Sequence, residues 1–311
     1  MGSEPVTQAP SRPGVGLALA ALGAVAFSGK AIIIKLAYRH GTDPTTLIML
    51  RMLFALPLFA AMAWWASRGK QALSLRDWAG VAYLGITGYY LSSYLDFLGL
   101  QYVTASLERL ILYLNPTLVV AMGWFMTRKP LRRTQLLGMA TSYGGVLLVF
   151  GHEVGLQGAE AAKGSALVLA SAVMYALYMV YSGQMVKRVG SLRLVGLATS
   201  VACLCVLAHF AATRPIAAAL DTPMPVVWLS LLNATVCTAI PVLLVMMAIE
   251  RVGPGVTAQT GMVGPLSTIF MGVALLGEPF TAWVAAGTVL VIAGIYLFTR
   301  APGAPAPQSR G

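Results

Sequence analysis

Long apolar runs, each close to the length that crosses a lipid bilayer, follow one another along almost the whole chain. A helix needs about 20 residues to span the hydrocarbon layer. Polar residues, glycine or proline separate ten such runs, which predict ten transmembrane helices. Their limits are 15–37, 45–66, 77–99, 103–126, 132–150, 164–186, 193–212, 226–249, 255–276 and 281–299. The longest connections are 151–163 and 213–225, so we expect any function to lie among the helices.

The scarcity of charge excludes a soluble protein. Only 10% of the 311 residues are charged and 58% are apolar, whereas soluble domains have about 25% charged and about 45–50% apolar residues. The same figures exclude intrinsic disorder, which needs low hydrophobicity and high charge. The first apolar run exceeds the 7–15 residues of a signal-peptide core, so it reads as a retained helix. The polar, proline-rich ends, 1–14 and 300–311, are predicted to be disordered tails.

The basic residues gather in alternate connections, which predicts the orientation of the chain. Basic residues are concentrated in cytoplasmic loops of membrane proteins. With a cytoplasmic N-terminus, the outer segments hold three cations, Arg39, Lys163 and Arg214. The inner segments hold fourteen: Arg12, Arg68, Lys70, Arg76, Arg128, Lys129, Arg132, Arg133, Lys187, Arg188, Arg193, Arg251, Arg300 and Arg310. Both termini are therefore expected in the cytoplasm, and the net charge of +11 indicates membrane orientation instead of nucleic-acid binding.

The two halves of the chain are related by a constant offset of 149 residues. Pro116 falls on Pro265, Gly138 on Gly287 and Gly145 on Gly294, while 128–130 (RKP) falls on 277–279 (GEP). Five helices per repeat is an odd number, so the second copy must be inserted upside down relative to the first. Inverted repeats are typical of alternating-access transporters. We predict a first repeat at 15–150, an outer loop at 151–163 and a second, inverted repeat at 164–299.

These repeat-end patterns resemble the EamA-type members of the drug/metabolite transporter superfamily. The resemblance covers all ten predicted helices and rests on Asn115–Pro116, Gly264–Pro265, Gly277–Glu278–Pro279, Gly287 and Gly294. The first copy departs from the family, because Arg128–Lys129 stands where Gly-Glu is usual. Within the family the chain most resembles the bacterial amino-acid exporters of the YddG type. The resemblance implies a bundle around a central cavity, a bacterial inner-membrane location and export of amino acids or similar metabolites.

Six ionisable residues fall inside predicted spans, where charge is costly and marks functional candidates. In the predicted orientation all six lie in the outer half of the bilayer and in the first repeat. We expect Lys30, Asp96, Glu108 and Arg109 to line a polar cavity that attracts a carboxylate and receives an ammonium group. Lys35 is expected to snorkel to the outer headgroups. The alternative is that the charges pair only to fix helix packing; the six are Lys30, Lys35, Arg51, Asp96, Glu108 and Arg109.

Aromatic and amide side chains form a second candidate set. Tyr83, Tyr90 and Tyr94 recur at i, i+7 and i+11, which predicts a single helical stripe. A tyrosine face offers stacking area and a hydroxyl, which suits a zwitterion with a variable side chain. Ordinary helix packing is the alternative. The residues selected as substrate contacts are Tyr90, Tyr94, Tyr113, Asn115 and Tyr178.

Three prolines within spans are candidate hinges. Each removes a backbone donor, tends to kink its helix and frees a carbonyl group. Such kinks could bend during rocking of a transporter, or they could be fixed packing bends. The three are Pro116, Pro241 and Pro265.

No cofactor, metal or nucleotide site is expected. Residues 23–30 (GAVAFSGK) have the wrong glycine spacing for a phosphate-binding loop and no preceding strand, so ATP is excluded. The three histidines and three cysteines show no metal-ligand spacing. Energy must then come from an ion gradient or from the gradient of the substrate itself.

The sequence therefore predicts an all-α membrane protein of ten helices in two inverted repeats around a central cavity. We expect a monomeric secondary transporter of amino acids, aromatic and other neutral ones among them, or of similar small metabolites. The partners are the substrate and the bilayer, without nucleic acid. One alternative keeps the fold and changes the cargo to nucleotide sugars, drugs or sugar phosphates. A more remote one is a membrane-embedded enzyme acting on lipids, for which no acid/base or metal constellation is found.

Overall fold

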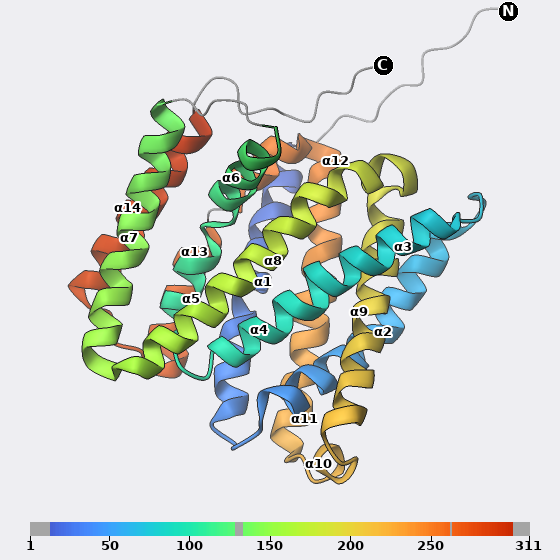
Figure 1. Ribbon diagram of the computed structural model, residues 1–311, viewed down its shortest axis with the longest axis horizontal. Coiled ribbons are helices and arrows are strands. Elements are labelled where there is room, and N and C mark those ends of the chain that lie inside the picture. Colours follow the sequence, from blue (N-terminus) through green and yellow to red (C-terminus); the bar gives the residue numbers. More distant parts are fainter. Residues whose placement is uncertain (1–12, 128–132, 262, 301–311) are drawn as a thin grey trace, which may run out of the picture.

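The computed structural model describes residues 13–127, 133–261 and 263–300, and the regular structure within them is helical. The helices pack as one bundle (Figure 1). The first half holds α1 (Pro13–Tyr38), α2 (Pro44–Ser67), α3 (Leu75–Leu84), η1 (Gly85–Leu91), α4 (Ser92–Gly99), α5 (Ala105–Leu112), α6 (Asn115–Thr127) and α7 (Arg133–Gln157). The second holds α8 (Ala159–Val189), α9 (Ser191–Thr213), α10 (Ala217–Leu220), α11 (Met224–Ala234), η2 (Thr235–Ala239), α12 (Ile240–Thr260), α13 (Val263–Met271), η3 (Gly272–Leu276) and α14 (Ala282–Arg300).

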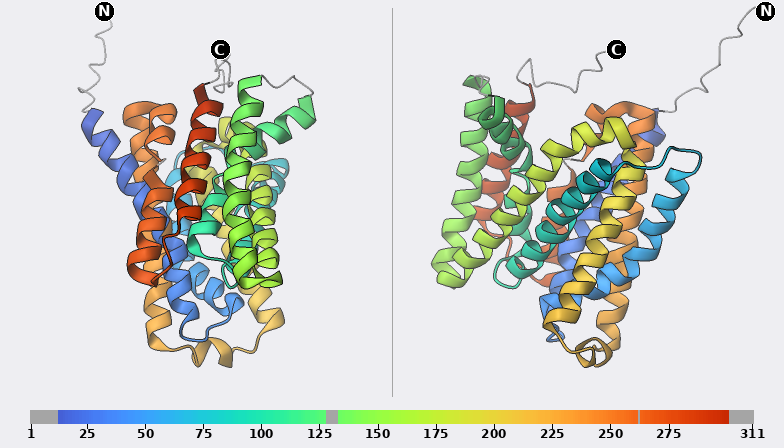
Figure 2. Two further views of the ribbon diagram at one scale, coloured as in Figure 1. Left: turned by 90° about the vertical axis from the view of Figure 1, so that its left-hand side faces the viewer. Right: turned by 45° about the vertical axis from the view of Figure 1, so that its right-hand side comes forward.

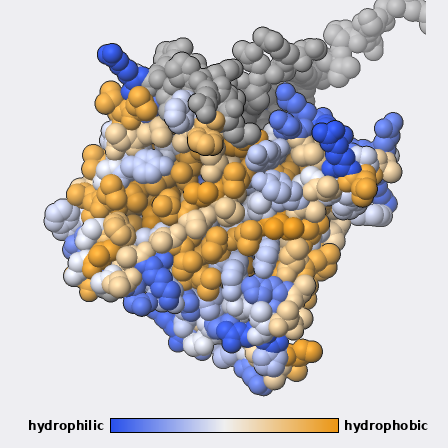
Figure 3. Space-filling view, in the orientation of Figure 1, coloured by the Kyte–Doolittle hydropathy of each residue, from blue (hydrophilic) through white to orange (hydrophobic). Residues whose placement is uncertain are grey.

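The surface of the bundle supports a protein that crosses the membrane several times. Hydrophobic side chains dominate the middle of the face in Figure 3, while hydrophilic ones gather toward the lower end and the upper right. Five described helices are long and apolar enough to span a bilayer: 14–38, 44–67, 159–189, 191–213 and 224–245. The other predicted spans include shorter or interrupted helices, so the count of ten is not confirmed. The backbone groups at the interruptions need hydrogen-bond partners within the protein, because lipid supplies none.

The ends of the helices carry the capping residues that the sequence supplies. Asp43 accepts hydrogen bonds from the backbone N–H groups of Thr45 and Thr46 and so starts α2, with Pro44 in its first turn. Ser74 and Asp77 form a reciprocal capping box at the start of α3. Gly190 has a φ of +88° between α8 and α9, a conformation that only glycine adopts without strain.

Small residues allow α7 and α14 to pack at backbone contact. A Cβ at Gly145 would lie 2.7 Å from the carbonyl oxygen of Gly287, and one at Gly294 would lie 2.6 Å from that of Gly138. The two helices are therefore antiparallel, because the residue numbers along them run in opposite directions through these contacts. Close approach of small residues is a common way to associate helices in a membrane, where apolar surface by itself gives no preference.

Interruptions in the helices recur at the 149-residue offset. The π-helical segment η1 covers Gly85–Leu91, and η2 covers Thr235–Ala239, which is 86–90 shifted by 149. The break between α5 and α6 falls at Tyr113–Leu114, and α12 ends before Gly261, one residue ahead of the position equivalent to Tyr113. The glycine contacts between α7 and α14 are also reciprocal, because Gly145 corresponds to Gly294 and Gly138 to Gly287. Equivalent residues thus make equivalent contacts.

Several predicted boundaries are wrong. The predicted loop 151–163 is mostly helical: α7 continues to Gln157, and α8 begins at Ala159 after one glycine with a φ of +66°. The predicted break at 250–254 is also absent, since α12 continues through Arg251 and the chain turns only at Gly261. Polar residues mark where a helix leaves the apolar layer, and they do not by themselves end it. The tails 1–12 and 301–311 and residues 128–132 lie outside the described residues.

The described chain ends lie at the same end of the bundle, here called the terminal end (Figures 1 and 2). The α2–α3 and α8–α9 connections also lie there, with the cations Arg68, Lys70, Lys187 and Arg188 in or next to them. Arg188 pairs with Asp77 at 2.9 Å between these two connections. The turns after α1 and α9 lie at the opposite end, called the distal end below.

Candidate functional site

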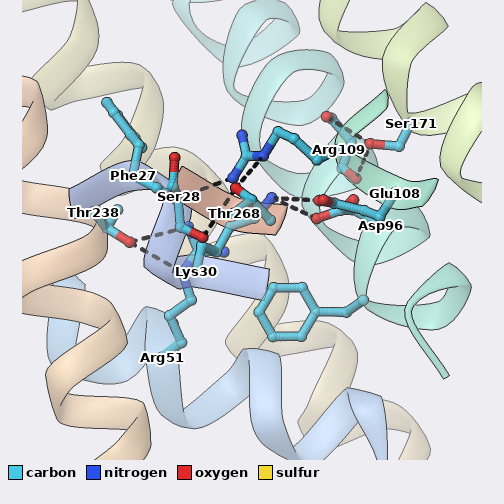
Figure 4. A network of polar contacts seen from close by, with 12 residues as sticks. Phe27, Ser28, Lys30, Arg51, Asp96, Glu108, Arg109, Ser171, Thr238 and Thr268 are labelled. Atoms are coloured by element: carbon cyan, nitrogen blue, oxygen red, sulfur yellow. Dashed lines mark hydrogen bonds and ion pairs between the residues drawn. The ribbon is translucent and has the colours of Figure 1, made fainter. Parts of the chain in front are cut away.

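A buried ion cluster joins α1 to α4 and α5. Lys30 Nζ lies 2.6 Å from Asp96 Oδ2 and 3.6 Å from Glu108 Oε1, so one ammonium group serves two carboxyl groups (Figure 4). The side chain of Asp96 is 2% exposed and that of Glu108 is fully buried. Asp96 Oδ1 and both oxygens of Glu108 have no hydrogen-bond partner in the structure. Three of the predicted cavity residues therefore come together, and the buried carboxyl oxygens Asp96 Oδ1 and Glu108 Oε2 can still accept hydrogen bonds.

Two arginines flank this cluster. Arg109 donates from Nε to Thr268 Oγ1 at 3.0 Å and from a terminal nitrogen to the carbonyl oxygen of Phe27 at 3.3 Å. It thereby connects α5 of the first half to α13 of the second half and to α1. Arg51 is buried, donates to Thr238 Oγ1 and stacks its guanidinium 5.4 Å from the ring centre of Phe97. These contacts give Arg51 a packing role between α2, η2 and α4.

The broken helices of the two halves meet at their breaks. The hydroxyl of Tyr113, at the break between α5 and α6, donates to the carbonyl oxygen of Gly261 at 2.8 Å. Ser28 Oγ donates to the carbonyl oxygen of Gly264 at 2.7 Å and so holds α1 against α13. Asn115 Oδ1 is buried without a hydrogen-bond partner at the start of α6. Breaks leave carbonyl and N–H groups for a ligand, as in the discontinuous helices of many transporters.

The three candidate hinge prolines lie beside interruptions of the helices. Pro116 is the second residue of α6 and Pro265 the third of α13. Proline is tolerated in a first turn, because the N–H it lacks has no partner within the helix there. Pro241 is the second residue of α12, and α12 follows η2 without a break in the helix. The first two prolines therefore begin new helices after a break, whereas the sequence predicts kinks within continuous spans.

The predicted tyrosine stripe is divided into separate groups. Tyr90 and Tyr94 stack with ring centres 6.4 Å apart, and Tyr90 hydrogen-bonds His209 Nδ1 at 2.7 Å. Tyr83 instead contacts Tyr181 edge to face. The single stripe is wrong because the π-helical segment η1 begins at Gly85, after Tyr83, and includes Tyr90. The wider turns of a π-helix change the angular position of the residues within and after it.

Tyr178 on α8 packs against η1, at Gly88 and Tyr89. Tyr178 hydrogen-bonds Tyr89 at 3.1 Å, is mostly buried and presses against the backbone at Gly88, where no Cβ would fit. Asp96 and Tyr94 point to different neighbours, since Asp96 meets Lys30 on α1 and Tyr94 meets His209 on α9. The predicted residues therefore lie in separate places. Charged residues gather at Lys30, Tyr113 and Asn115 lie at the break between α5 and α6, and Tyr90 with Tyr94 is separate from Tyr178.

Sequence reasoning missed the acidic contacts at the start of α5. Glu278 accepts hydrogen bonds from the backbone N–H groups of Ala105 (2.7 Å) and Ser106 (3.3 Å) and from Ser106 Oγ (2.9 Å). Glu153 accepts from the backbone N–H and the hydroxyl of Thr104. A carboxylate at a helix N-terminus is favourable because it meets unsatisfied N–H groups and the positive end of the helix dipole. The spacing of Glu153 and Glu278 in the sequence carries no signal of this meeting.

A cavity of about 700 Å³ opens at the distal end, beside these contacts. Its lining includes Lys35, Arg39, Asp43 and Glu278, and it does not include Lys30, Asp96 or Glu108. Lys35 does not snorkel to the headgroups as predicted, because its Nζ donates to the carbonyl oxygens of Leu100 (3.2 Å) and Val103 (2.7 Å). These are the free carbonyls after α4, and they attract the ammonium group inward.

Comparison with known proteins decides the family. The EamA-like transporter family matches the chain twice, over residues 14–151 and 162–300. The chain belongs to the EamA-like transporter family. The two matches cover the two halves related by the 149-residue offset. This membership also means that the resemblance inferred from the repeat-end patterns is confirmed at the level of the family.

The EamA relatives are described as transporters. The chain is 32% identical over 272 residues to the uncharacterized transporter YcbK of Bacillus subtilis, covering 83% of this chain and 84% of the relative. It is 24% identical over 287 residues to an uncharacterized transporter of Archaeoglobus fulgidus, covering 90% and 96%. One crystal structure matches with a TM-score of 0.61 at 19% identity, covering 91% of this chain, and it supports the fold alone. These relatives support a membrane transporter of small molecules, and they do not carry the finer resemblance to YddG-type exporters.

Proposed function

We propose that this EamA protein is a secondary transporter that exports amino acids or similar small metabolites across the bacterial inner membrane by alternating access. The proposal places ten spans in two inverted repeats, 15–150 and 164–299, with both termini in the cytoplasm. The observation that carries it is the Lys30–Asp96–Glu108 cluster, buried beside the paired helix breaks. Charge inside a membrane is costly and is retained where it handles substrate or ions.

The inverted topology is supported by the reciprocal features of the two halves. The antiparallel packing of α7 and α14 and the paired π segments η1 and η2 follow the offset of 149 residues, and the helix breaks fall within one residue of it. An axis in the membrane plane relates such repeats in alternating-access transporters, with the substrate site near the midplane. The cations at the terminal end support a cytoplasmic location for that end.

The chemistry of the cluster suits a zwitterion. An incoming ammonium group can take the place of Lys30 against Asp96 or Glu108, whose buried oxygens include Asp96 Oδ1 and Glu108 Oε2 without a hydrogen-bond partner. A carboxylate can be received by Arg109, or by the Lys30 that is thereby released. The hydroxyl of Tyr113 and the amide of Asn115 lie at the adjoining break. The stacked pair Tyr90 and Tyr94 offers the aromatic surface for a variable side chain.

The contacts of Glu278 close the path at the distal end. They tie the turn before α14, in the second repeat, to the start of α5 in the first repeat. Rocking of one repeat against the other would have to break them, since they join the two moving bodies. Pro116, Pro241 and Pro265 are the proposed hinges. In this conformation the distal cavity is an antechamber whose lining includes Lys35 and does not include the ion cluster.

The transport proposal is tested with the purified protein in liposomes. Uptake of a panel of labelled amino acids is measured with and without a pH gradient, for wild type, Asp96→Asn and Glu108→Gln. We expect saturable transport of neutral amino acids that either variant reduces at least tenfold. The matched control is Glu160→Gln, which neutralises an exposed carboxylate outside the cluster. Absence of transport for every amino acid, or full activity of both cluster variants, would contradict the proposal.

The same proteoliposomes test proton coupling. If Asp96 or Glu108 carries the coupled proton, neutralising it removes the dependence of uptake on the pH gradient while exchange of substrate across the membrane persists. Facilitated diffusion predicts no such dependence in the wild type.

The topology is tested by labelling single cysteines from each side of the membrane. Lys70→Cys and Asp221→Cys, placed in a background without the three native cysteines, are both exposed positions at opposite ends of the bundle. We expect an impermeant thiol reagent to label them from opposite faces. Labelling from one face would overturn the inverted arrangement.

A further inference from the structure

A second cavity of about 800 Å³ lies in a groove between α1 and α11, and its lining shares Arg39 with the distal cavity. The two helices run side by side toward the distal end (Figures 1 and 2). The groove is mostly apolar, and its lining includes Leu36, Trp228, Leu229 and Leu232. The side chain of Trp228 is 64% exposed although it lies in a wall of the groove. The exposed side chains of Trp228 and Leu232 show that this surface faces outward from the bundle, where the proposed topology places lipid.

The length of the groove matches one leaflet. Along α11 and η2 its lining runs from Pro225 to Thr235, which is about 15 Å at the helical rise of about 1.5 Å per residue. The hydrocarbon layer is about 30 Å thick, so the groove reaches from one interface to about the midplane. Trp228 lies one turn inside the start of α11, at the depth where tryptophan side chains anchor a protein at the membrane interface.

The end of the groove nearest the distal end of the bundle carries basic side chains. Arg39 and His40 line it at the turn after α1, and both are exposed. Asp43, the carboxylate of this turn, is occupied by the start of α2 and by Arg214, whose guanidinium lies 3.2 Å away. Arg39 uses a terminal nitrogen to donate to the carbonyl oxygen of Leu276. Its guanidinium has five N–H donors, so others remain for a phosphate.

We propose that this groove binds an anionic phospholipid, with one acyl chain along α11 and the phosphate at Arg39. Apolar lining of leaflet length with a cation at the headgroup level fits a phospholipid better than it fits a free anion, which needs no apolar channel. Arg39 also lines the distal cavity. The guanidinium of Arg39 would then hold a lipid phosphate and the carbonyl oxygen of Leu276 together. Because Leu276 ends η3 just before the Glu278 turn, this shared contact connects lipid composition to the distal closure.

Lipid binding is measured on the full-length protein in detergent by native mass spectrometry, with phosphatidylglycerol and phosphatidylethanolamine of identical acyl chains as probes. We expect phosphatidylglycerol to bind at least tenfold more tightly and to raise the unfolding temperature. Arg39→Gln is expected to weaken its binding about tenfold, as loss of a charge-assisted contact does. Trp228→Ala is expected to weaken both lipids, because it shortens the apolar wall.

The matched control is Arg68→Gln, which removes an interfacial arginine stacked 3.9 Å over Trp64 at the terminal end. It is expected to leave phosphatidylglycerol binding within twofold of the wild type. Equal loss in Arg68→Gln and Arg39→Gln, or equal affinity for the two lipids, would overturn the proposal. Equal stabilisation by inorganic phosphate would identify a headgroup site without the groove. Efficient disulfide formation between two copies of Trp228→Cys would show that a second copy of the chain covers the groove. Either this disulfide or equal stabilisation by inorganic phosphate would overturn the lipid assignment.

Discussion

Removing the ammonium group of Lys30 is expected to destabilise the protein strongly. At an effective dielectric of about 20, the attraction is about 6 kcal/mol for the 2.6 Å contact with Asp96 and about 5 kcal/mol for the 3.6 Å contact with Glu108. Desolvation of the three groups offsets most of this attraction. Deleting one partner of a buried pair nevertheless costs about 3–5 kcal/mol, because the other charge stays buried without compensation. We expect Lys30→Met to lower the free energy of unfolding by that amount.

The structure supplies its own probe for the measurement. Cys203 and Cys237 are buried free thiols, so a thiol-reactive fluorophore reports their exposure on unfolding in a titration with denaturing detergent. Cys205 is half-exposed and is replaced by serine in every variant. Lys163→Met, which removes an exposed lysine that contacts Tyr102, is the control and is expected to leave the midpoint unchanged.

A double-mutant cycle tests the electrostatic reasoning. Lys30→Met/Asp96→Asn removes one uncompensated carboxylate, so it is expected to recover about 2 kcal/mol of the loss in Lys30→Met. Costs that add within about 0.5 kcal/mol would refute the reasoning, because additivity is the behaviour of groups that do not interact. A cost of Lys30→Met near zero would likewise show that the cluster is not held by charge.

Two further perturbations separate the packing of the halves from the distal closure. Gly145→Val is expected to destabilise the protein by about 1–3 kcal/mol in the same thiol assay, because its side chain would collide with the backbone of α14 at Gly287. The control is Gly144→Val, since a side chain at Gly144 meets open space. Equal effects of the two substitutions would contradict the close contact. Glu278→Ala is expected to cost about 0.5–2 kcal/mol by uncapping α5 at Ala105, and an unchanged midpoint would argue against a closing role.

The sequence alone predicts membrane insertion, the repeat and the grouping of Lys30, Asp96 and Glu108, because these depend on local hydrophobicity and on the cost of charge in lipid. It does not predict η1 or η2. A π turn changes one hydrogen-bond register without an obvious residue signature, and the tyrosine stripe was wrong for that reason. His209 shows why isolated polar residues are hard to interpret: its partners, Tyr90 and Tyr94, come from a helix more than a hundred residues away.

The amino-acid sequence by itself determined which segments enter the bilayer, since about 20 consecutive apolar side chains favour lipid whatever surrounds them. It also determined the 149-residue correspondence, which is a property of the chain itself. Tertiary packing alone decided that Glu153 and Glu278 meet at the start of α5, and that Lys35 turns inward to Leu100 and Val103. Unsatisfied backbone groups at helix ends recruit whichever side chain the bundle brings near, and that neighbour is set by the arrangement of helices in space.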